Sequence, residues 1–245
     1  MEILVVGTGS SGNMYVITEG EHRIILDAGM PMKMLIQAIG GLKGIEGCLV
    51  THEHKDHAGS ALEMMRYGVD VYATYGTAKA AALSGVRLHV VKIGEPFTKG
   101  HFTIIPFPTQ HDALEPCGFL VRHNPTRAIF LYATDTYYLK NTFPDVNFWL
   151  VECNYSDAIV NEQAEKGLIE KMLLNRLRRS HMSLRRLKQT LAANDLTQAR
   201  KIVLLHLSDG RSDEIQMVTE ITEQTGVETV AADAGMIIDL SLTPF

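Results

Sequence analysis

The chain has 245 residues, of which 46% are hydrophobic and 21% are charged, and its formal net charge is −5. This length and composition predict one folded domain over 1–245 and exclude a disordered or membrane-embedded protein. The net charge argues against a protein that coats nucleic acid non-specifically. Because the three cysteines lack paired spacing and no segment reaches the ~18 apolar residues of a membrane span, we expect a cytoplasmic protein without membrane contact.

Short apolar runs typical of strands dominate the first half of the chain. We expect strands there at 2–6, 14–18, 23–26, 45–50, 70–72, 88–92, 102–107, 118–122 and 128–131, and helices at 33–39, 58–67 and 77–83. In the second half we expect helices at 157–178, 184–194 and 213–224, and strands at 148–151, 201–206, 228–231 and 236–240. Two series of strands, each followed by helices, suit two sheets packed face to face with helices outside.

The segment 51–59, Thr-His-Glu-His-Lys-Asp-His-Ala-Gly, concentrates three imidazoles and two carboxylates in six positions. His52 and His54 alternate, so they share one side of an extended segment, whereas Asp56 and His57 fall at the turn into the next helix. Imidazole nitrogens and carboxylate oxygens bind borderline divalent ions at about 2.0–2.2 Å. The segment therefore predicts two adjacent metal positions, with a solvated polar turn as the alternative.

Two metals need more ligands than this segment supplies, and three further candidates follow expected strands: His111, Asp135 and His206. Each of them alone would be interpreted as a surface polar group or a hydrogen-bonded core histidine. Together with the segment 51–59 they favour metal ligation. Glu152 and Asn154 follow the strand expected at 148–151 and are candidates for lining the same site.

With these residues the chain resembles the metallo-β-lactamase superfamily, whose pattern is an early Asp, then His-x-His-x-Asp-His, then His, Asp and His. The resemblance implies an α/β fold of the αββα type, with two mixed sheets flanked by helices and the site at one edge of both sheets. It also implies two divalent metal ions, Zn or Mn. In that pattern one ion is held by His52, His54 and His111, the other by Asp56, His57 and His206, with Asp135 bridging them and Asp27 orienting the histidine loop.

Further segments resemble a compact type within this superfamily, the YycJ/WalJ type: Gly-Ser-Ser-Gly-Asn at 9–13, Glu-Cys-Asn at 152–154, Ser-His-Met-Ser at 180–183 and His-Leu-Ser at 206–208. That type implies a DNA exonuclease acting from 5′ ends. We therefore expect hydrolysis of phosphodiester bonds in nucleic acid by a hydroxide held between the metals and oriented by Asp56. Hydrolysis of a small thioester or lactone, and metal binding without catalysis, are the alternatives.

A glycine-rich segment at 7–12 fits the dinucleotide-binding pattern G-x-G-x-x-G, but it runs into an expected strand rather than a helix, so we reject that interpretation. As a loop between strands it leaves Ser10, Ser11 and Asn13 free to bind a phosphate, although a tight turn explains it equally well.

A basic stretch at 171–188 contains seven lysines and arginines and no acidic residue. We expect Arg178 and Arg179 to contact substrate phosphates, with a solvated helix face as the alternative. His181, in the same stretch, is placed to stabilise the leaving oxygen, or else belongs to a helix-capping turn. The remaining histidines are expected at the surface without histidine or carboxylate neighbours: His22, His89, His101 and His123.

Overall fold

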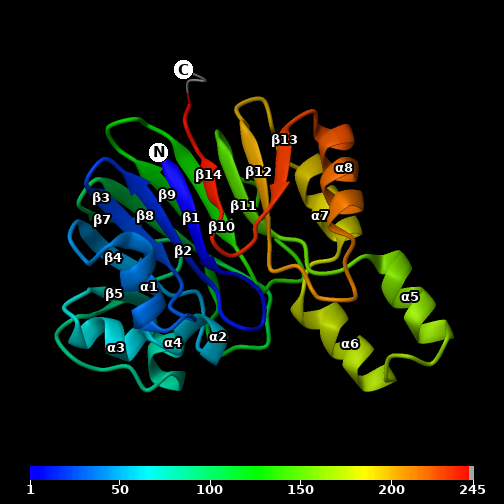
Figure 1. Ribbon diagram of the computed structural model, residues 1–245, viewed down its shortest axis with the longest axis horizontal. Coiled ribbons are helices and arrows are strands. Elements are labelled where there is room, and N and C mark those ends of the chain that lie inside the picture. Colours follow the sequence, from blue (N-terminus) through cyan, green and yellow to red (C-terminus); the bar gives the residue numbers. More distant parts are fainter. Residues whose placement is uncertain (243–245) are drawn as a thin grey trace.

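Two seven-stranded sheets lie face to face in the computed structural model, which describes residues 1–242 (Figure 1). The first sheet contains, in spatial order, β14 (Ile237–Asp239), β1 (Glu2–Gly7), β2 (Met14–Glu19), β3 (His22–Leu26), β4 (Ile45–Leu49), β5 (Val71–Thr74) and β6 (Leu88–Val91). The second contains β13 (Glu228–Ala231), β12 (Lys201–Leu205), β11 (Phe148–Glu152), β10 (Ile129–Ala133), β9 (Cys117–His123), β8 (Phe102–Pro108) and β7 (Phe97–Lys99).

Helices cover the outer faces of both sheets, which completes the αββα arrangement predicted from the sequence (Figure 1). The first sheet packs against α1 (Met32–Ile39), α2 (Lys55–Ala58), α3 (Ala61–Arg66) and α4 (Tyr75–Ala80). The second packs against α7 (Leu184–Ala192) and α8 (Glu214–Thr225), while α5 (Asp157–Glu165) and α6 (Lys171–Ser180) pack against each other at the side. No helix within 1–242 is long and apolar enough to cross a membrane.

The central strands of both sheets are apolar on both faces because they are buried on both sides. In β11, Phe148 and Leu150 point into the core between the sheets, whereas Trp149 and Val151 pack against the helices α7 and α8. The same division separates Ile24 and Leu26 of β3, in the central core, from Ile25, beneath the helices. This continuous burial explains why short unbroken apolar runs located the strands.

The structure differs from the prediction in several local features. The helix expected at 157–178 is two helices, α5 and α6, because Gly167 adopts a left-handed conformation with a φ of 67° that ends the first. The short strand β7 (Phe97–Lys99) was not predicted, since three residues carry too little of an alternating pattern. His123, expected at the surface, is 2% exposed and packs beside Phe102.

An ion-pair network joins the two sheets at one lateral edge. Asp70, which precedes β5, lies 2.8 Å from Lys99 of β7 and 2.9 Å from Arg87, measured from carboxylate oxygen to side-chain nitrogen. Burial alone would raise the pKa of the Asp70 carboxyl, but hydrogen bonds from Lys99 and Arg87 outweigh it and lower that pKa to about 2. The network therefore stabilises the ionised form of Asp70.

Replacing Asp70 with asparagine is expected to lower the free energy of unfolding by about 1 kcal/mol at neutral pH, a value reduced for the exposure of both cations. Because the pKa falls from an ordinary 3.8 to about 2 on folding, this contribution is complete above pH 3.8 and is lost as the pH falls towards 2. Urea unfolding of parent and variant at about pH 7, 4 and 3 measures it. A difference in unfolding free energy between parent and variant that stays the same as the pH falls from about 7 to about 3 would contradict the assignment.

Candidate metal centre and cleft

The candidate ligands meet because the strands that carry them end at the same edge of the sandwich. β3 and β4 are parallel, as are β10, β11 and β12, and β8 runs in the direction of β10 through two antiparallel pairings. Just beyond these strand ends lie Asp27, the segment 51–59, His111, Asp135 and His206. Three of these residues adopt left-handed backbone conformations, namely Asp27 (φ 59°), Asp135 (φ 46°) and His206 (φ 56°). Non-glycine residues rarely do so, and such strain is typical of functional sites.

The first cluster brings His52, His54, His111 and Asp135 together. Nδ1 of His54 lies 3.1 Å from Nε2 of His52 and 3.1 Å from Nε2 of His111. Because Nδ1 of His111 donates to the Ser180 carbonyl at 2.9 Å, its Nε2 carries the lone pair in the neutral ring. If Nδ1 of His54 carried a proton, it could form a hydrogen bond to only one of these two Nε2 atoms. The spacing of the three nitrogens is instead close to the distance of about 3.4 Å that separates two ligands of a tetrahedral ion. These nitrogens fit a divalent metal.

The second cluster shares Asp135 with the first and adds Asp56, His57 and His206. Nε2 of His57 lies 3.5 Å from Asp135 Oδ2 and 3.7 Å from Asp56 Oδ2, and Nδ1 of His206 lies 3.4 Å from Asp135 Oδ1. Nε2 of His206 is buried without a hydrogen-bond partner among residues 1–242. Buried ring nitrogens normally have a partner, and a bound cation would supply one for this atom.

Asp27 is fully buried and connects the histidine segment to both sheets. Its carboxylate accepts hydrogen bonds from the Thr51 backbone N–H (2.8 Å), the Tyr132 hydroxyl (2.6 Å) and Nδ1 of His57 (2.7 Å). Burial opposes protonation of His57, but the carboxylates of Asp135 and Asp27 outweigh it and raise the His57 pKa well above its ordinary value. A cation is thus favoured beside Asp135, and a metal would supply that charge in place of the proton.

Glu152, the last residue of β11, contacts His206 of the second cluster and the neighbouring His181. The sequence indicated only that Glu152 lines the site. It is fully buried, and Oε1 lies 2.7 Å from Nδ1 of His181 and 3.2 Å from Nδ1 of His206. Oε2 accepts the backbone N–H groups of Thr136 and Met182. Burial opposes both charges of the His181 pair, yet mutual attraction raises the pKa of His181 to about 9 and lowers that of Glu152. Glu152 therefore fixes a protonated His181 beside Asp135.

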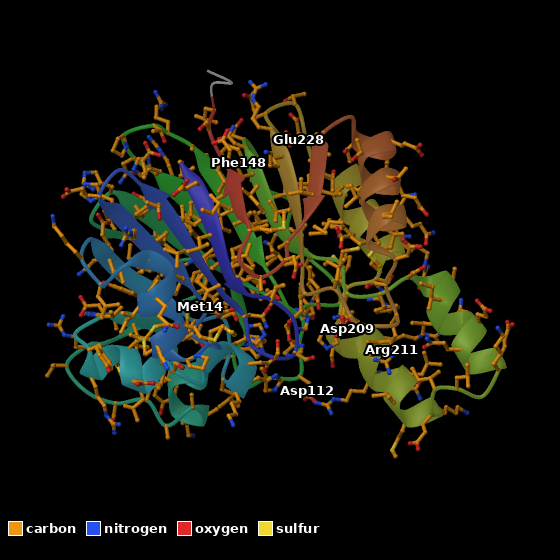
Figure 2. All side chains as sticks on the ribbon, viewed as in Figure 1. Met14, Asp112, Phe148, Asp209, Arg211 and Glu228 are labelled. Carbon is orange, nitrogen blue, oxygen red and sulfur yellow. The ribbon has the colours of Figure 1, made fainter. Side chains whose placement is uncertain are left out.

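Both clusters open into a cleft of about 490 Å³ at the lower end of the sheets, and Figure 2 shows Asp112 and Arg211 there near α6. Three cationic side chains line the cleft together with the ligands: Lys55, Arg176 and Arg211. A second pocket of about 450 Å³ adjoins it and shares Ser10, Lys55 and Asp56. A larger groove of about 600 Å³ beside α7 and α8 contains none of the candidate ligands, so we place the site in the cleft.

The glycine-rich loop joins the antiparallel strands β1 and β2, as predicted, but its polar side chains are divided. Ser10 lines the cleft and Ser11 lines the adjoining pocket, and both are exposed. Asn13 is fully buried, because its amide closes the loop onto Gly9 and its Nδ2 lies 3.0 Å from Nε2 of His57. Asn13 is therefore not presented to a substrate phosphate, which corrects the expectation for this residue.

The basic stretch 171–188 does not form one continuous phosphate-binding surface. Arg178 donates to Asn161 at 2.7 Å, and neither Arg178 nor Arg179 lines the cleft, contrary to expectation. Most of the other basic side chains find partners on other elements, which a local reading of the sequence cannot reveal: Arg185 with Asp157, Arg186 with the Tyr137 carbonyl and Lys188 with Glu220. The cleft instead receives Arg176 from this stretch and Arg211 from the loop after His206.

An αββα sandwich that gathers histidines and aspartates at the shared edge of its sheets defines a class, the metal-dependent hydrolases with the metallo-β-lactamase fold. The chain belongs to the β-lactamase superfamily, since the model of the family described as "Beta-lactamase superfamily domain" matches residues 22–207. The resemblance inferred from the motifs is thereby confirmed.

Two curated relatives match along most of their length. The chain is 24% identical to "Exodeoxyribonuclease WalJ" of Streptococcus pneumoniae serotype 2 over 255 residues, covering 97% of this chain and 91% of the relative. It is 27% identical to "Exodeoxyribonuclease YycJ" of Bacillus anthracis over 239 residues, covering 91% and 89%. The crystal structure of the metallo-β-lactamase-fold protein YhfI from Bacillus subtilis superposes with a TM-score of 0.70 at 14% identity, over 97% of this chain and 99% of that one. This superposition confirms the fold.

Proposed function

We propose that this protein is a two-metal phosphodiesterase that degrades DNA from its 5′ end. The observation that carries the proposal is the cleft itself, which is lined by Lys55, Arg176 and Arg211 together with residues of both ligand clusters. Such a site suits a substrate with several phosphates, because one phosphate can lie at the clusters while its neighbours contact the cations. The names of the two full-length relatives support the same substrate class.

The donor set fits two borderline divalent ions, zinc or manganese. We assign His52, His54 and His111 to one ion and Asp56, His57 and His206 to the other, with Asp135 shared. When bound, such ions supply a nucleophilic water at neutral pH, because coordination lowers the pKa of water from 15.7 to about 7, and they polarise the phosphoryl oxygens.

The chain's own residues position the substrate and move its protons. Asp56 is partly exposed beside the shared Asp135, so its carboxylate can orient the attacking water. The His181 ring lies in the cleft with Nδ1 held by Glu152, and it can give a proton to the departing oxygen. The exposed Ser10 and Arg176 and the partly exposed Arg211 hold the phosphates on either side of the scissile bond.

A panel of substrates tests this proposal. The protein is incubated with Mn²⁺ or Zn²⁺ and with 5′-labelled and 3′-labelled DNA and RNA, single- and double-stranded, and in parallel with a small thioester and a lactone. We expect DNA to be shortened from its 5′ end, with the 3′ label retained on progressively shorter strands. Turnover of the thioester or lactone with intact nucleic acid would overturn the proposal in favour of a small-acyl hydrolase.

Replacing Arg176 with alanine is expected to raise KM for a DNA strand about tenfold, because one charge-assisted contact to a phosphate is worth about 1.4 kcal/mol. Turnover of bis(p-nitrophenyl) phosphate, which has no flanking phosphates, should change little. Arg178→Ala is the matched control, since Arg178 lies on the same helix and is exposed but lies outside the cleft. Equal effects of the two substitutions on DNA would contradict the assignment of Arg176.

A further inference from the structure

A second group of histidines lies away from the cleft, where the sequence suggested isolated surface residues. His22 and His101 face each other with ring centroids 3.6 Å apart, and Glu46 contacts both of them. Oε1 of Glu46 is 2.7 Å from Nδ1 of His22 and 3.1 Å from Nδ1 of His101. The expectation that these histidines lack carboxylate and histidine neighbours is therefore wrong, because their partners come from distant parts of the chain.

The three side chains can converge on one ion. Each offers one ligand atom, and these atoms lie within 4.8 Å of one another. Two imidazoles and a carboxylate, with a water in the fourth position, form a common zinc donor set. Glu46 is only 12% exposed, whereas the two histidines are about 40% exposed, so an ion has access from solvent. Among residues 1–242 no lysine or arginine pairs with Glu46, and a divalent cation would supply that charge.

The backbone of the turn between β7 and β8 leaves room for the Glu46 carboxylate and donates a hydrogen bond to it. Gly100 adopts a left-handed φ of 52° in the turn between β7 and β8, and a Cβ atom at this position would collide with the Glu46 carboxylate. The next residue, His101, donates its backbone N–H to Oε2 of Glu46 at 2.8 Å. Oε2 is thus held by the turn while Oε1 faces the two rings, so the carboxylate is fixed in orientation before any ion binds.

The cluster also joins the two sheets at the end opposite the cleft. His22 begins β3 and Glu46 lies in β4 of the first sheet, whereas His101 precedes β8 of the second. β3 runs from His22 at this cluster to Asp27 at the cleft, and β8 runs from His101 towards His111. The seven residues of β8 span roughly 20 Å, so the two sites lie about that far apart. The two sets of ligands are therefore separate, and an ion held here would cross-link the sheets.

We infer that His22, Glu46 and His101 form a binding site for a divalent metal ion, separate from the cleft, that fastens the β7–β8 turn to β3 and β4. Zinc suits the nitrogen and oxygen donors. Because the unfolded chain cannot hold the three ligands together, binding stabilises the folded state. The inference does not depend on the reaction catalysed in the cleft.

Metal content tests the inference directly. The parent protein and the variants His101→Ala and Glu46→Gln are dialysed against the same buffered Zn²⁺, and bound zinc per chain is measured by mass spectrometry. We expect each variant to bind one equivalent less than the parent and to gain less in thermal midpoint on adding Zn²⁺. His89→Ala, which removes another half-exposed histidine, should match the parent. Equal zinc content in parent and variants would overturn the inference.

A measurement on the parent alone guards against variants that fold poorly. Diethyl pyrocarbonate modifies accessible histidines, and peptide mapping reports each of them. At a Zn²⁺ concentration about tenfold above the dissociation constant, modification of His22 and His101 should slow about tenfold, whereas that of His89 should not change. Unchanged modification of His22 and His101 would overturn the site even if the variants could not be purified.

Discussion

Replacing His54 with alanine is expected to lower the rate of DNA hydrolysis at least about 10³-fold. Nδ1 of His54 is the atom that Nε2 of His52 and Nε2 of His111 both approach, so its removal opens the centre of the first ligand cluster. Loss of the ion held there removes several kcal/mol of transition-state stabilisation. His54 is only partly buried, and the truncation should leave the fold intact.

Initial rates on 5′-labelled DNA and metal content per chain are measured together for the His54 variant. His89→Ala serves as the control, because it removes a histidine outside both ligand clusters of the cleft. We expect the His54 variant to lose activity and one metal equivalent while its thermal unfolding in EDTA stays close to that of the parent. A variant with parental turnover and parental metal content would refute the ligand assignment.

Replacing Asp27 with asparagine is expected to have the second-largest effect, although Asp27 is not assigned as a ligand. Its two oxygens receive only donors, from Thr51, Tyr132 and His57, so an amide NH₂ would face one of these donors. We expect a 10–100-fold loss of metal affinity, since partners that orient ligating histidines have effects of this size. The buried mismatch should also cost about 2 kcal/mol of stability.

The affinity is measured by competition with a chromophoric chelator, and the stability by urea unfolding in EDTA. Tyr132→Phe is the matched control, because it removes one donor to Asp27 and leaves the carboxylate and its contact with His57 in place. We expect this control to retain metal affinity within a few-fold of the parent. If Asp27→Asn bound metal as tightly as the parent, the orienting role of Asp27 would be refuted.

The sequence predicted the layers of the fold well because burial on both sides makes these strands short, unbroken apolar runs. β11 is one example, with Phe148 and Leu150 facing the other sheet and Trp149 and Val151 facing the helices. Predictions failed where one residue governs the backbone, as Gly167 does between α5 and α6. Strand β7 was missed because its few residues carry no periodic signal.

The candidate ligands could be located from the sequence because four of them are concentrated in the segment 51–59 and the other three lie within three residues of a strand end. Parallel strands bring such ends to one edge. Contacts across the fold could not be located in this way. Arg178 pairs with Asn161 on a neighbouring helix, and Glu46 contacts two histidines that are distant in sequence. The central position of Glu152 has the same origin, since its four partners come from three other segments of the chain.

Hydrolysis of 5′-labelled DNA by metal-depleted protein, before and after addition of Mn²⁺ or Zn²⁺, tests the central claim most directly. The proposed two-metal phosphodiesterase should leave the DNA intact after depletion and should release 5′-terminal product once either ion is restored. In the same assay, the His54→Ala protein should remain inactive with both ions. Cleavage at the parental rate without metal, or intact DNA after both ions are restored to the parent, would contradict the account.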